Sequence, residues 1–455
     1  MMPAPFHWTD AAVRRALELP GGDSEAGYEG VSTDTRTLRP GELFVALRGD
    51  RFDGHDFIAQ AVAAGCGGVV ADRGPDDCAV PLYRVPDTLK ALGSLALHRR
   101  LQTSVPVVGV TGSSGKTTVK ELILGALEGS HRAHGTRANR NNRIGTPLTI
   151  LSMPETATAL VLEMGTSEPG EIAELARIAR PTVGVVTTVS ETHVERLGDL
   201  DGVLAEKLDL LRALGGAGAA VVGDEPDVLA SEARQVHPRL QVAGWSPRAD
   251  RDLRPRGARH HSDGSWSFTW MGHPVGLGTP GAHSVYNALL ALAVARLLNV
   301  PPARAAAGVS RVGPGPMRGE VRRAGGITLL VDCYNANAAG VAAAVTTLEG
   351  MSARGRRVAV LGTMLELGAR SEMIHTEALA RALRAGIDRY VLTGAFANAA
   401  RQVSDDRIHL VDDVASLAEA LPELVGPTDT VLLKASRGVR LERAIPVLES
   451  LGGEE

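Results

Sequence analysis

The residues with the clearest chemical meaning lie in one stretch, VPVVGVTGSSGKTTVK, at residues 105–120. An apolar run breaks into a turn of Gly and Ser, and a Lys and two Thr open the helix-like run that follows. This order is typical of a strand, a phosphate-binding loop and a helix, because backbone N–H groups and the helix N-terminus attract phosphate oxygens. We predict a nucleoside triphosphate site, with Lys116 at the terminal phosphates and the Thr117 hydroxyl on Mg²⁺.

The spacing of this stretch differs from the usual phosphate-loop pattern, because Val110 lies where the first Gly is expected. The sequence instead has G-x-x-G-x-x-G-K-T, starting at Gly109. A Gly-rich turn that happens to precede a Lys is the alternative, and the flanking strand and helix patterns favour the nucleotide site. The residues expected around the phosphates are Gly109, Thr111, Gly112, Ser113, Ser114, Gly115, Lys116, Thr117 and Thr118.

Two further residues follow predicted strands and could bind a metal ion. Glu163 comes directly after the apolar run 159–162, and His193 lies six residues beyond the run 183–187. Because parallel sheets gather ligands at the C-terminal ends of their strands, we expect both side chains near the phosphate loop. A carboxylate and an imidazole there could hold a divalent cation, since Mg²⁺ takes few protein ligands and completes its shell with substrate phosphates. A lone Glu or His is more often structural.

Other polar stretches could contact a substrate. STDTR, at residues 32–36, could bind a sugar nucleotide, although a solvated turn fits it equally well. NRNNRIGTPL, at residues 139–148, could close over phosphates or a carboxylate, or be an ordinary loop. Asp332, residues 334–337 and residues 434–437 follow strand-like runs near the C-terminus. Lys207, in a predicted helix, is expected on spacing alone to be a solvated side chain.

Repeated alternation of strand-like and helical segments must position these residues. It predicts α/β architecture with largely parallel sheets covered by helices. We expect three domains, residues 1–103, 104–312 and 313–455, with the Gly- and Pro-rich stretch VGPGP at the second boundary. Residues 224–279 have a less regular pattern and are expected to form a small β-rich insertion. The expected strands are 43–47 and 67–71 in the first domain, 105–110, 159–162, 183–187 and 219–222 in the second, and 327–331, 357–361, 389–392 and 430–433 in the third. The expected helices are 11–19, 58–65, 89–103, 200–214 and 287–298.

Composition excludes several classes of function. The 455 residues carry a net charge of −4 and only 3% aromatic residues, which disfavours nucleic-acid binding. The three cysteines, Cys66, Cys78 and Cys333, form no C-x-x-C pair, and their odd number disfavours a disulfide framework. MMPAPFHWTD lacks the pattern of a signal peptide, and the most apolar stretch, 288–300, is too short to span a bilayer. We expect a cytoplasmic monomer without membrane insertion.

Ten stretches taken together resemble the Mur ligase family of cell-wall amide ligases. They run in family order across nearly the whole chain and are STDTR, ELFVALRGDRFDGHDF, GVTGSSGKTT, NNRIGTPLT, LEMG, HVERLG, GAHSVYNAL, PMRGE, DCYNAN and LGTMLELG. The phosphate loop alone identifies only a nucleotide site. FVALRGDRFDGHDF and DCYNAN are more specific, because they distinguish the dipeptide-adding members from relatives that add one amino acid.

The resemblance implies three domains: an N-terminal α/β substrate domain, a central phosphate-loop ATPase domain with a parallel sheet, and a C-terminal Rossmann-like doubly wound domain. It implies ATP as the nucleotide and two Mg²⁺ ions. Lys207 matches the family lysine that is carbamylated, which supplies an extra carboxylate near the second ion. Residues implied as catalytic are Lys116, Lys207 and His193, those implied as metal ligands are Thr117, Glu163, His193 and Lys207, and those implied around the rest of the nucleotide are His283, Asn287, Arg318 and Asp332.

The resemblance also implies the substrates, UDP-N-acetylmuramoyl-tripeptide and D-alanyl-D-alanine. An amide bond would form through an acyl phosphate, with release of ADP and phosphate. The residues implied in substrate binding are Ser32, Asp34, Arg36, Asn142 and Thr146 for the UDP-linked substrate, and Tyr334, Asn335 and Asn337 in the domain that would take the dipeptide.

Several positions depart from the family pattern. Thr363 stands for a usual Asp, Ala338 for a Pro, Ala435 for a Gly and Thr188 for an Asn, and Lys207 is followed by Leu208-Asp209 instead of Gly-Glu. The departures concern the fit of the dipeptide site more than the ATP chemistry. Two alternatives stay open: another ligase with the same ATP chemistry, such as a folylpolyglutamate synthase or a different Mur step, and a nucleotide-dependent switch that hydrolyses ATP without ligation. The switch would have no need of the metal residues together.

Overall fold

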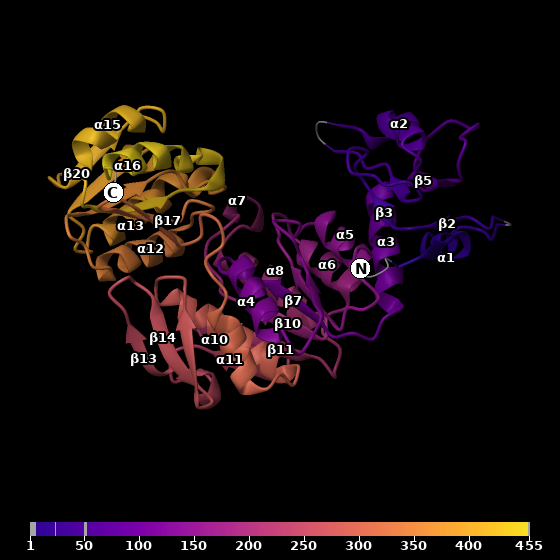
Figure 1. Cartoon of the computed structure of the whole chain (residues 1–455), viewed down its shortest axis with the longest axis horizontal. Coiled ribbons are helices and arrows are strands. Elements are labelled where there is room, and N and C mark those ends of the chain that lie inside the picture. Colours follow the sequence, from indigo (N-terminus) through magenta and orange to yellow (C-terminus); the bar gives the residue numbers. More distant parts are fainter. Residues whose placement is uncertain (1–5, 23, 50–51, 454–455) are drawn as a thin grey trace.

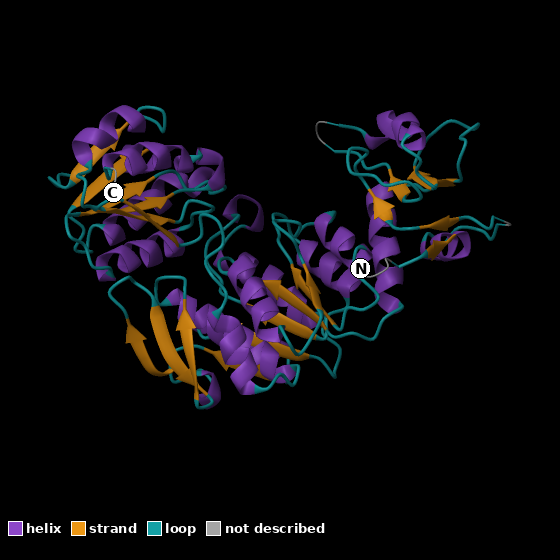
Figure 2. Cartoon of the chain, viewed as in Figure 1, coloured by secondary structure: helices purple, strands orange, loops and turns teal. Residues whose placement is uncertain are grey.

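The computed structural model describes residues 6–22, 24–49 and 52–453, and it contains three α/β units along the chain (Figure 1). The first five residues of MMPAPFHWTD, and Asp50 and Arg51 of the FVALRGDRFDGHDF stretch, lie outside the described residues. The central unit lies between the other two, and helices cover both faces of the large sheets (Figures 1 and 2). The predicted α/β class with three domains is confirmed.

The N-terminal unit contains a four-stranded parallel sheet, in the order β3-β4-β5-β6, and a separate short antiparallel pair, β1-β2. Its sheet is buried on both faces, since all three residues of β4 and all four of β5 are buried. The elements are β1 (Trp8–Thr9), α1 (Asp10–Ala16), β2 (Gly27–Tyr28), β3 (Val31–Ser32), β4 (Leu43–Val45), η1 (Gly54–Phe57), α2 (Ile58–Ala63), β5 (Gly68–Ala71), β6 (Leu82–Arg84) and α3 (Thr88–Leu101).

The central unit contains a six-stranded sheet in the order β12-β11-β10-β7-β9-β8, in which every neighbouring pair is parallel. The strand before the phosphate loop, β7, is therefore an inner strand, and β9 and β10 flank it. This topology brings the ends of these three strands together at one edge of the sheet. The main elements are β7 (Val107–Thr111), α4 (Lys116–Leu127), β8 (Ala133–Gly135), α5 (Gly145–Leu151), β9 (Ala159–Glu163), α6 (Glu171–Ala179), β10 (Val183–Val186), α7 (Val194–Leu197), α8 (Leu200–Arg212), β11 (Ala219–Gly223), α10 (His283–Leu297) and α11 (Pro302–Ser310).

The β-rich insertion expected at residues 224–279 is only partly correct. Its first part forms helix α9 (Asp227–Val236) and strand β12 (Leu240–Ala243), which extends the main sheet beside β11. Leu229, Ala230 and Ala233 form the buried face of α9, so the helix has the apolar spacing that packing on a sheet requires. The remainder is a separate antiparallel sheet of β13 (Arg256–His260), β14 (Trp266–Trp270) and β15 (His273–Leu277), preceded by η2 (Arg251–Leu253).

The C-terminal unit contains a second six-stranded sheet, in the order β16-β17-β21-β18-β19-β20. Edge strand β16 is antiparallel to β17, and the other pairs are parallel. The elements are β16 (Glu320–Ala324), β17 (Ile327–Val331), α12 (Ala338–Gly350), β18 (Arg357–Leu361), η3 (Gly368–Arg370), α13 (Ser371–Ala382), β19 (Arg389–Thr393), α14 (Ala395–Ala400), β20 (Ile408–Val411), α15 (Leu417–Leu424), β21 (Thr430–Lys434), η4 (Arg437–Val439), η5 (Leu441–Ala444) and α16 (Ile445–Leu451).

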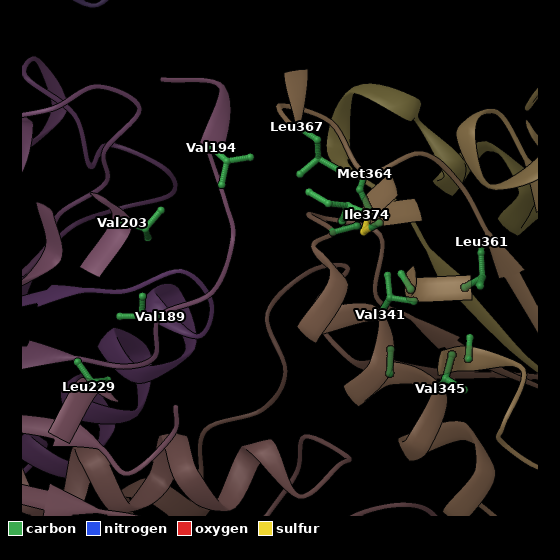
Figure 3. Close-up of a cluster of buried hydrophobic side chains, with 14 of the residues drawn as sticks. Val189, Val194, Val203, Leu229, Val341, Val345, Leu361, Met364, Leu367 and Ile374 are labelled. Carbon is green, nitrogen blue, oxygen red and sulfur yellow. The ribbon is translucent and has the colours of Figure 1, made fainter. Parts of the chain in front are cut away.

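One cluster of buried apolar residues extends from the central unit into the C-terminal unit. Val194 of α7 and Leu367 before η3 belong to it, and they lie on opposite sides of the contact between the two units (Figure 3). The two units therefore share apolar packing next to the helix that follows His193. Within the part of the chain that the structure describes, no helix is long and apolar enough to cross a membrane.

Candidate active site

The phosphate loop follows β7 and has a backbone that requires glycine at two positions. Gly112 has φ 148° and Gly115 has φ 82°, in a region that side chains other than Gly rarely adopt. A Cβ at Gly112 would lie 1.9 Å from Thr187 Oγ1, and one at Gly115 would lie 2.7 Å from Asn287 Oδ1. Gly115 begins α4 without a side-chain cap. The free N–H groups of this helix end thus lie in the loop, where a phosphate can accept from them.

Ser113 fixes the loop against the segment that precedes His193. Its backbone N–H donates to Thr188 O at 2.8 Å, and its hydroxyl donates to Ser190 O at 3.0 Å. Thr192 Oγ1 donates back to Ser113 Oγ at 3.1 Å. Both the backbone N–H and the hydroxyl of Ser113 are therefore engaged within the protein, and neither is free for the predicted contact with phosphate in this arrangement.

Lys116, the first residue of α4, turns back onto its own loop. Its Nζ donates to the carbonyl of Gly112 at 2.6 Å. Burial lowers the pKa of this ammonium group, the charges of Glu163 and Glu366 oppose the shift, and Arg318 adds to it. The lysine therefore lies within electrostatic reach of two carboxylates and one guanidinium, and Glu366 and Arg318 of this set come from the C-terminal unit. Thr117 and Thr118 follow it on the first turn of α4.

Glu163, at the end of β9, has a buried carboxylate with one free oxygen. Its side chain is 2% exposed, and Oε1 accepts from Asn141 Nδ2 at 2.8 Å. Oε2 has no hydrogen-bond partner among the described residues. A buried carboxylate oxygen without a donor, next to a phosphate loop, fits a ligand of a hard cation. Asn141 was not predicted, although it adjoins Asn142 in the NNRIGTPLT stretch.

His193 lies directly before α7, with its backbone in the left-handed region at φ 54°. Its Nδ1 is 2.7 Å from Glu366 Oε2 of the C-terminal unit. The hydrogen bond from His193 holds the pKa of the Glu366 carboxyl below its usual range. Glu366 was missed at the level of sequence, where the only signal was its position in LGTMLELG. Among the described residues, no three His, Cys, Asp or Glu side chains form a metal cluster, so a cation here would depend on substrate oxygens as well.

Lys207 is buried in α8, and the solvated position expected from spacing is wrong. Its side chain is 2% exposed. Burial, with a contribution from the charge of Lys116, lowers the pKa of Lys207 to about 7. Neighbouring Glu206 accepts from the backbone N–H groups of Gly170 at 2.7 Å and Ile172 at 2.8 Å, at the start of α6. A lysine with this pKa is neutral in about half of the molecules near pH 7, whereas an exposed lysine is almost always charged there.

The residues predicted around the remainder of the nucleotide come from two units. Helix α10 begins at His283, four residues earlier than expected, and Asn287 on it lies against Gly115. From the C-terminal unit, the Arg318 guanidinium stacks on the ring of Tyr334, 3.7 Å from its centroid. Asp332 pairs with Lys434, with Nζ 2.8 Å from Oδ2.

Asn337 connects the C-terminal unit to the phosphate loop directly. Its Oδ1 accepts from Gly340 N at 2.7 Å and caps helix α12, while its Nδ2 donates to Ser114 Oγ at 2.9 Å. Asn335 is exposed, and its carbonyl accepts from Lys434 Nζ at 2.6 Å. Asn337 therefore uses both ends of its amide within the protein in this arrangement, and Asn335 keeps an exposed side chain.

The residues predicted for the UDP-linked substrate lie where the N-terminal and central units meet. Helix α5, which begins beside Thr146, packs against β3, which ends at Ser32. Thr146 is fully buried, and its Oγ1 has no partner among the described residues. Asn142 Oδ1 accepts from the N–H of Gly145, the first residue of α5, at 2.9 Å.

Asp34 and Arg36 face each other on the loop after β3. Arg36 Nη2 is 2.6 Å from Asp34 Oδ2, and this contact lowers the pKa of the Asp34 carboxyl. The side chain of Arg36 is 84% exposed. Arg36 Nε also donates to Asp34 Oδ1 at 2.8 Å, so both carboxylate oxygens hold one edge of an exposed guanidinium.

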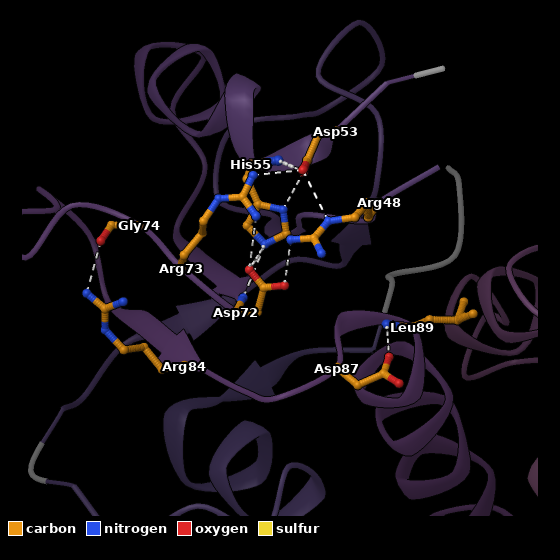
Figure 4. Close-up of polar contacts among 9 residues, drawn as sticks. All are labelled: Arg48, Asp53, His55, Asp72, Arg73, Gly74, Arg84, Asp87 and Leu89. Carbon is orange, nitrogen blue, oxygen red and sulfur yellow. Dashed lines mark hydrogen bonds and ion pairs between the residues drawn. The ribbon is translucent and has the colours of Figure 1, made fainter. Parts of the chain in front are cut away.

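A charged network holds the FDGHDF segment of the N-terminal unit in place (Figure 4). The buried His55 ring lies between two carboxylates, with Nδ1 2.5 Å from Asp53 Oδ1 and Nε2 3.0 Å from Asp72 Oδ1. Arg73 Nη2 is 2.8 Å from Asp53 Oδ2, and Arg48 Nη2 is 3.0 Å from Asp72 Oδ2. The network explains why this stretch is dense in polar residues: it joins the loop after β4 to the end of β5.

Comparisons with known proteins match the same three regions. The Mur ligase family, catalytic domain model matches residues 27–100, the Mur ligase middle domain matches 110–295, and the Mur ligase, glutamate ligase domain matches 317–437. UDP-N-acetylmuramoyl-tripeptide–D-alanyl-D-alanine ligase of Bacillus subtilis is 37% identical over 91% of this chain and 92% of its own. A crystal structure of MurF from Acinetobacter baumannii superposes with a TM-score of 0.90 at 28% identity, covering 98% of this chain and all of that one. The MurF ligase of Thermotoga maritima in complex with ADP has a TM-score of 0.83 at 30% identity, covering 92% and 97%.

Proposed function

The chain belongs to the Mur ligase family, and from this premise we propose that it joins D-alanyl-D-alanine to UDP-N-acetylmuramoyl-tripeptide at the expense of ATP. The observation that carries the proposal is identity of 37% and 36% with two curated ligases over nearly the whole of each chain, both named for this reaction. The reaction belongs to the synthesis of the cell-wall precursor. ATP is the nucleotide, as the ADP-bound relative supports.

The first chemical step activates the peptide carboxylate. A carboxylate is a poor electrophile, because its leaving group would be oxide. Transfer of the γ-phosphoryl group of ATP to the peptide carboxylate gives an acyl phosphate, whose leaving group is inorganic phosphate. Phosphoryl transfer needs positioning and neutralisation of charge more than covalent help from the protein. The loop N–H groups after Ser113 and the Lys116 ammonium are the groups of this chain that supply both.

Mg²⁺ fits the residues present, and we propose two ions. Bound Mg²⁺ would add positive charge at the phosphate and acyl oxygens. Thr117, Glu163 and His193 would hold it, and the free Glu163 Oε2 supports this assignment. A carbamate on Lys207 would complete the set. Formation of that carbamate needs a neutral amine, and burial with a pKa of about 7 supplies one.

In the second step the amine of the dipeptide attacks the acyl phosphate and phosphate leaves. Water is the competing nucleophile, so the site must be closed while the intermediate exists. The contacts Asn337–Ser114 and His193–Glu366 bring the C-terminal unit over the phosphate loop, which supports a closing role. Asp332, Tyr334 and Asn335 lie on the same unit, and we assign the dipeptide to that side.

Each of the three units would bind a different substrate. We propose residues 1–103 for the UDP end of the substrate, with Ser32, Asp34 and Arg36 as contacts. Residues 104–312 would bind ATP, and residues 313–455 would bind the dipeptide and close the site. The three free cysteines fit a reducing compartment, and we assign the protein to the cytoplasm as a monomer.

A coupled assay of phosphate release tests the function. The purified protein receives ATP and Mg²⁺ with either substrate alone, with both, or with glutamate and a folate in their place. We expect release only with UDP-N-acetylmuramoyl-tripeptide and D-alanyl-D-alanine together, and a product whose mass equals the sum of the two minus water. Release that is indifferent to both would contradict the ligase and favour a nucleotide-hydrolysing switch.

A further inference from the structure

Two short segments form a second contact between the central and C-terminal units, besides the one between Asn337 and Ser114. One is residues 191–197, around α7, and the other is residues 364–370, which we term the closing loop. The pair His193–Glu366 is joined by a second pair, in which Arg370 Nη2 is 2.8 Å from Glu191 Oε1. Val194 and Leu367 add apolar packing at the same contact (Figure 3). The closing loop therefore reaches the residue that we propose as a metal ligand.

His193 and Glu366, the two partners of the first pair, both have unusual backbone conformations. His193 has φ 54° and Glu366 has φ 65°, in the left-handed region that costs energy for residues with a side chain. Two such residues meeting across a domain contact indicate that the side-chain directions are specified by the fold. The His193 side chain is 23% exposed and the Glu366 side chain 63% exposed, so the pair lies at the edge of the domain contact.

The chemistry of the pair places a hydrogen on one particular ring nitrogen of His193. A carboxylate can only accept a hydrogen bond, so the hydrogen between the two groups belongs to His193 Nδ1. Neutral imidazole carries one ring hydrogen, and the lone pair then lies on Nε2. Metal-binding histidines generally donate their other ring N–H to a carboxylate or carbonyl, which orients the ring and raises its basicity.

We propose that Glu366 is a positioning residue that fixes His193 with Nε2 free for Mg²⁺, and that closure of the C-terminal unit delivers this carboxylate. The inference rests on the proposed function only for the identity of the cation. In this proposal, tight binding of Mg²⁺ at His193 requires the closed arrangement of the two units. The enzyme would therefore hydrolyse little ATP while the C-terminal unit is open.

The same contact contains its own control. Arg370 and Glu191 form an ion pair across the same two segments, with side chains 37% and 34% exposed. Within the described residues, neither side chain forms a hydrogen bond or ion pair with His193. Arg370→Ala therefore weakens the contact without removing the partner of the imidazole. Glu366→Ala removes the partner, and Glu366→Gln keeps the size of the side chain while removing its charge.

The first experiment observes the ring directly. Nitrogen NMR of protein labelled at histidine, with the His193 signal assigned by its absence in His193→Gln, reports which ring nitrogen carries hydrogen. We expect the Nδ1–H form in the unaltered protein and in Arg370→Ala, and a shift toward the Nε2–H form in Glu366→Ala. The same form in all proteins, or the same shift in Arg370→Ala, overturns the inference.

The second experiment measures cation binding with Mn²⁺ as the probe. Free Mn²⁺ is followed by electron paramagnetic resonance at a saturating concentration of a non-hydrolysable ATP analogue. Loss of an outer carboxylate typically weakens metal binding by about 10- to 100-fold, and we expect this for Glu366→Ala and Glu366→Gln, with Arg370→Ala within about 3-fold of the unaltered protein. Equal affinity in all variants overturns the inference. Neither experiment uses the peptide substrates, so failure of the proposed ligase reaction would appear separately, in the phosphate-release assay.

Discussion

The central and C-terminal units use similar sheets in different ways. Each has six strands, and loops that follow parallel strands of the two units touch: Asn337 and Glu366, after β17 and β18, contact Ser114 and His193, after β7 and β10. The central unit offers backbone N–H groups to the nucleotide. They lie in a loop whose glycines and following helix are determined by the local sequence. The C-terminal unit contributes side chains, among them Asn337 and Glu366, whose positions relative to the loop depend on how the two units meet. The phosphate loop is therefore formed within one unit, whereas Asn337 and Glu366 reach it only when the C-terminal unit packs against the central unit.

The largest expected effect comes from a substitution in the phosphate loop. Lys116→Ala removes the positive charge beside the terminal phosphates, and we expect kcat to fall by about 10³-fold or more, as for other charge-stabilising groups in phosphoryl transfer. Phosphate release under saturating substrates is the measurement. Retained binding of ADP would show that the loop still folds. A fall in kcat of less than about 10-fold would mean that Lys116 keeps its contact with Gly112 throughout the reaction. That result would contradict the role of the phosphate loop given above.

Lys207 gives the next largest effect and a dependence on pH. Because CO₂ reacts with the neutral amine and the pKa of Lys207 is about 7, carbamate formation should fall as the pH drops through 7 and level off above it. Carbon NMR with labelled bicarbonate, between about pH 6 and 8, follows the signal. Lys207→Ala should be inactive and partly restored by a short-chain carboxylic acid, which supplies the missing oxygens.

Lys120 provides the control for this prediction. It is also buried, but its Nζ donates to Thr136 O at 2.8 Å and pairs with Glu121, so its ammonium form has partners. Labelled bicarbonate should therefore leave Lys120 unmodified. A carbamate on Lys120 instead of Lys207, or a Lys207 signal that needs a pH near 10, would contradict the account.

A smaller effect tests the connection between the phosphate loop and the C-terminal unit. Asn337→Ala removes both the cap of α12 and the hydrogen bond to Ser114, and loss of a cap alone costs about 1 kcal/mol of stability. Ser114→Ala removes only the contact with the loop. A double-mutant cycle on the free energy of activation should give a coupling energy of about 0.5–1.5 kcal/mol. Strict additivity would mean that the contact between Asn337 and the phosphate loop is absent when catalysis occurs.

The smallest expected effect is that of Arg370→Ala. A partly exposed ion pair contributes about 0–1 kcal/mol, so kcat/KM should stay within about 5-fold of the unaltered protein. High salt should reduce the difference further. Steady-state assays at two ionic strengths check this, and a loss comparable to that of Lys116→Ala would show that closure, rather than the phosphate loop, dominates the energetics.

Local signals in the sequence were sufficient for most of the fold. The strands β7, β9, β10 and β11, and four strands of the C-terminal sheet, were all expected within two residues of their bounds, because short buried apolar runs between turns are typical of parallel sheets. Helix α9 and strand β12 were missed. Their buried faces consist of a few Leu, Val and Ala residues among charges, and only packing against β11 identifies them.

The site was predictable where one segment carries the chemistry and unpredictable where two segments must meet. The phosphate loop, Glu163 and His193 follow strand ends, and the topology brings those ends together. Glu366 and Asn141 have no such signal, since each acts on a residue distant in the sequence. The burial of Lys207 in α8 was likewise invisible to spacing, and only the family resemblance indicated a role.

Ala338 illustrates a departure from the family that the structure makes harmless. It is the first residue of α12, directly after the cap Asn337. Proline is favoured at this position because its missing N–H has no partner in a helix and its φ is already suitable, but other residues also occupy it. The usual Pro can therefore be replaced by Ala without loss of the cap. Thr363 has taken a role in the fold, since its Oγ1 accepts from Ala395 N at 3.0 Å.

Transfer of labelled oxygen tests the central claim, that ATP activates the peptide carboxylate. UDP-N-acetylmuramoyl-tripeptide with ¹⁸O in both oxygens of its terminal carboxylate is incubated with ATP, Mg²⁺ and D-alanyl-D-alanine, and the inorganic phosphate is examined by phosphorus NMR. An acyl phosphate predicts that one ¹⁸O moves into each phosphate released while the other stays in the new amide. Unlabelled phosphate would contradict the mechanism, because the phosphoryl group would then have gone to water.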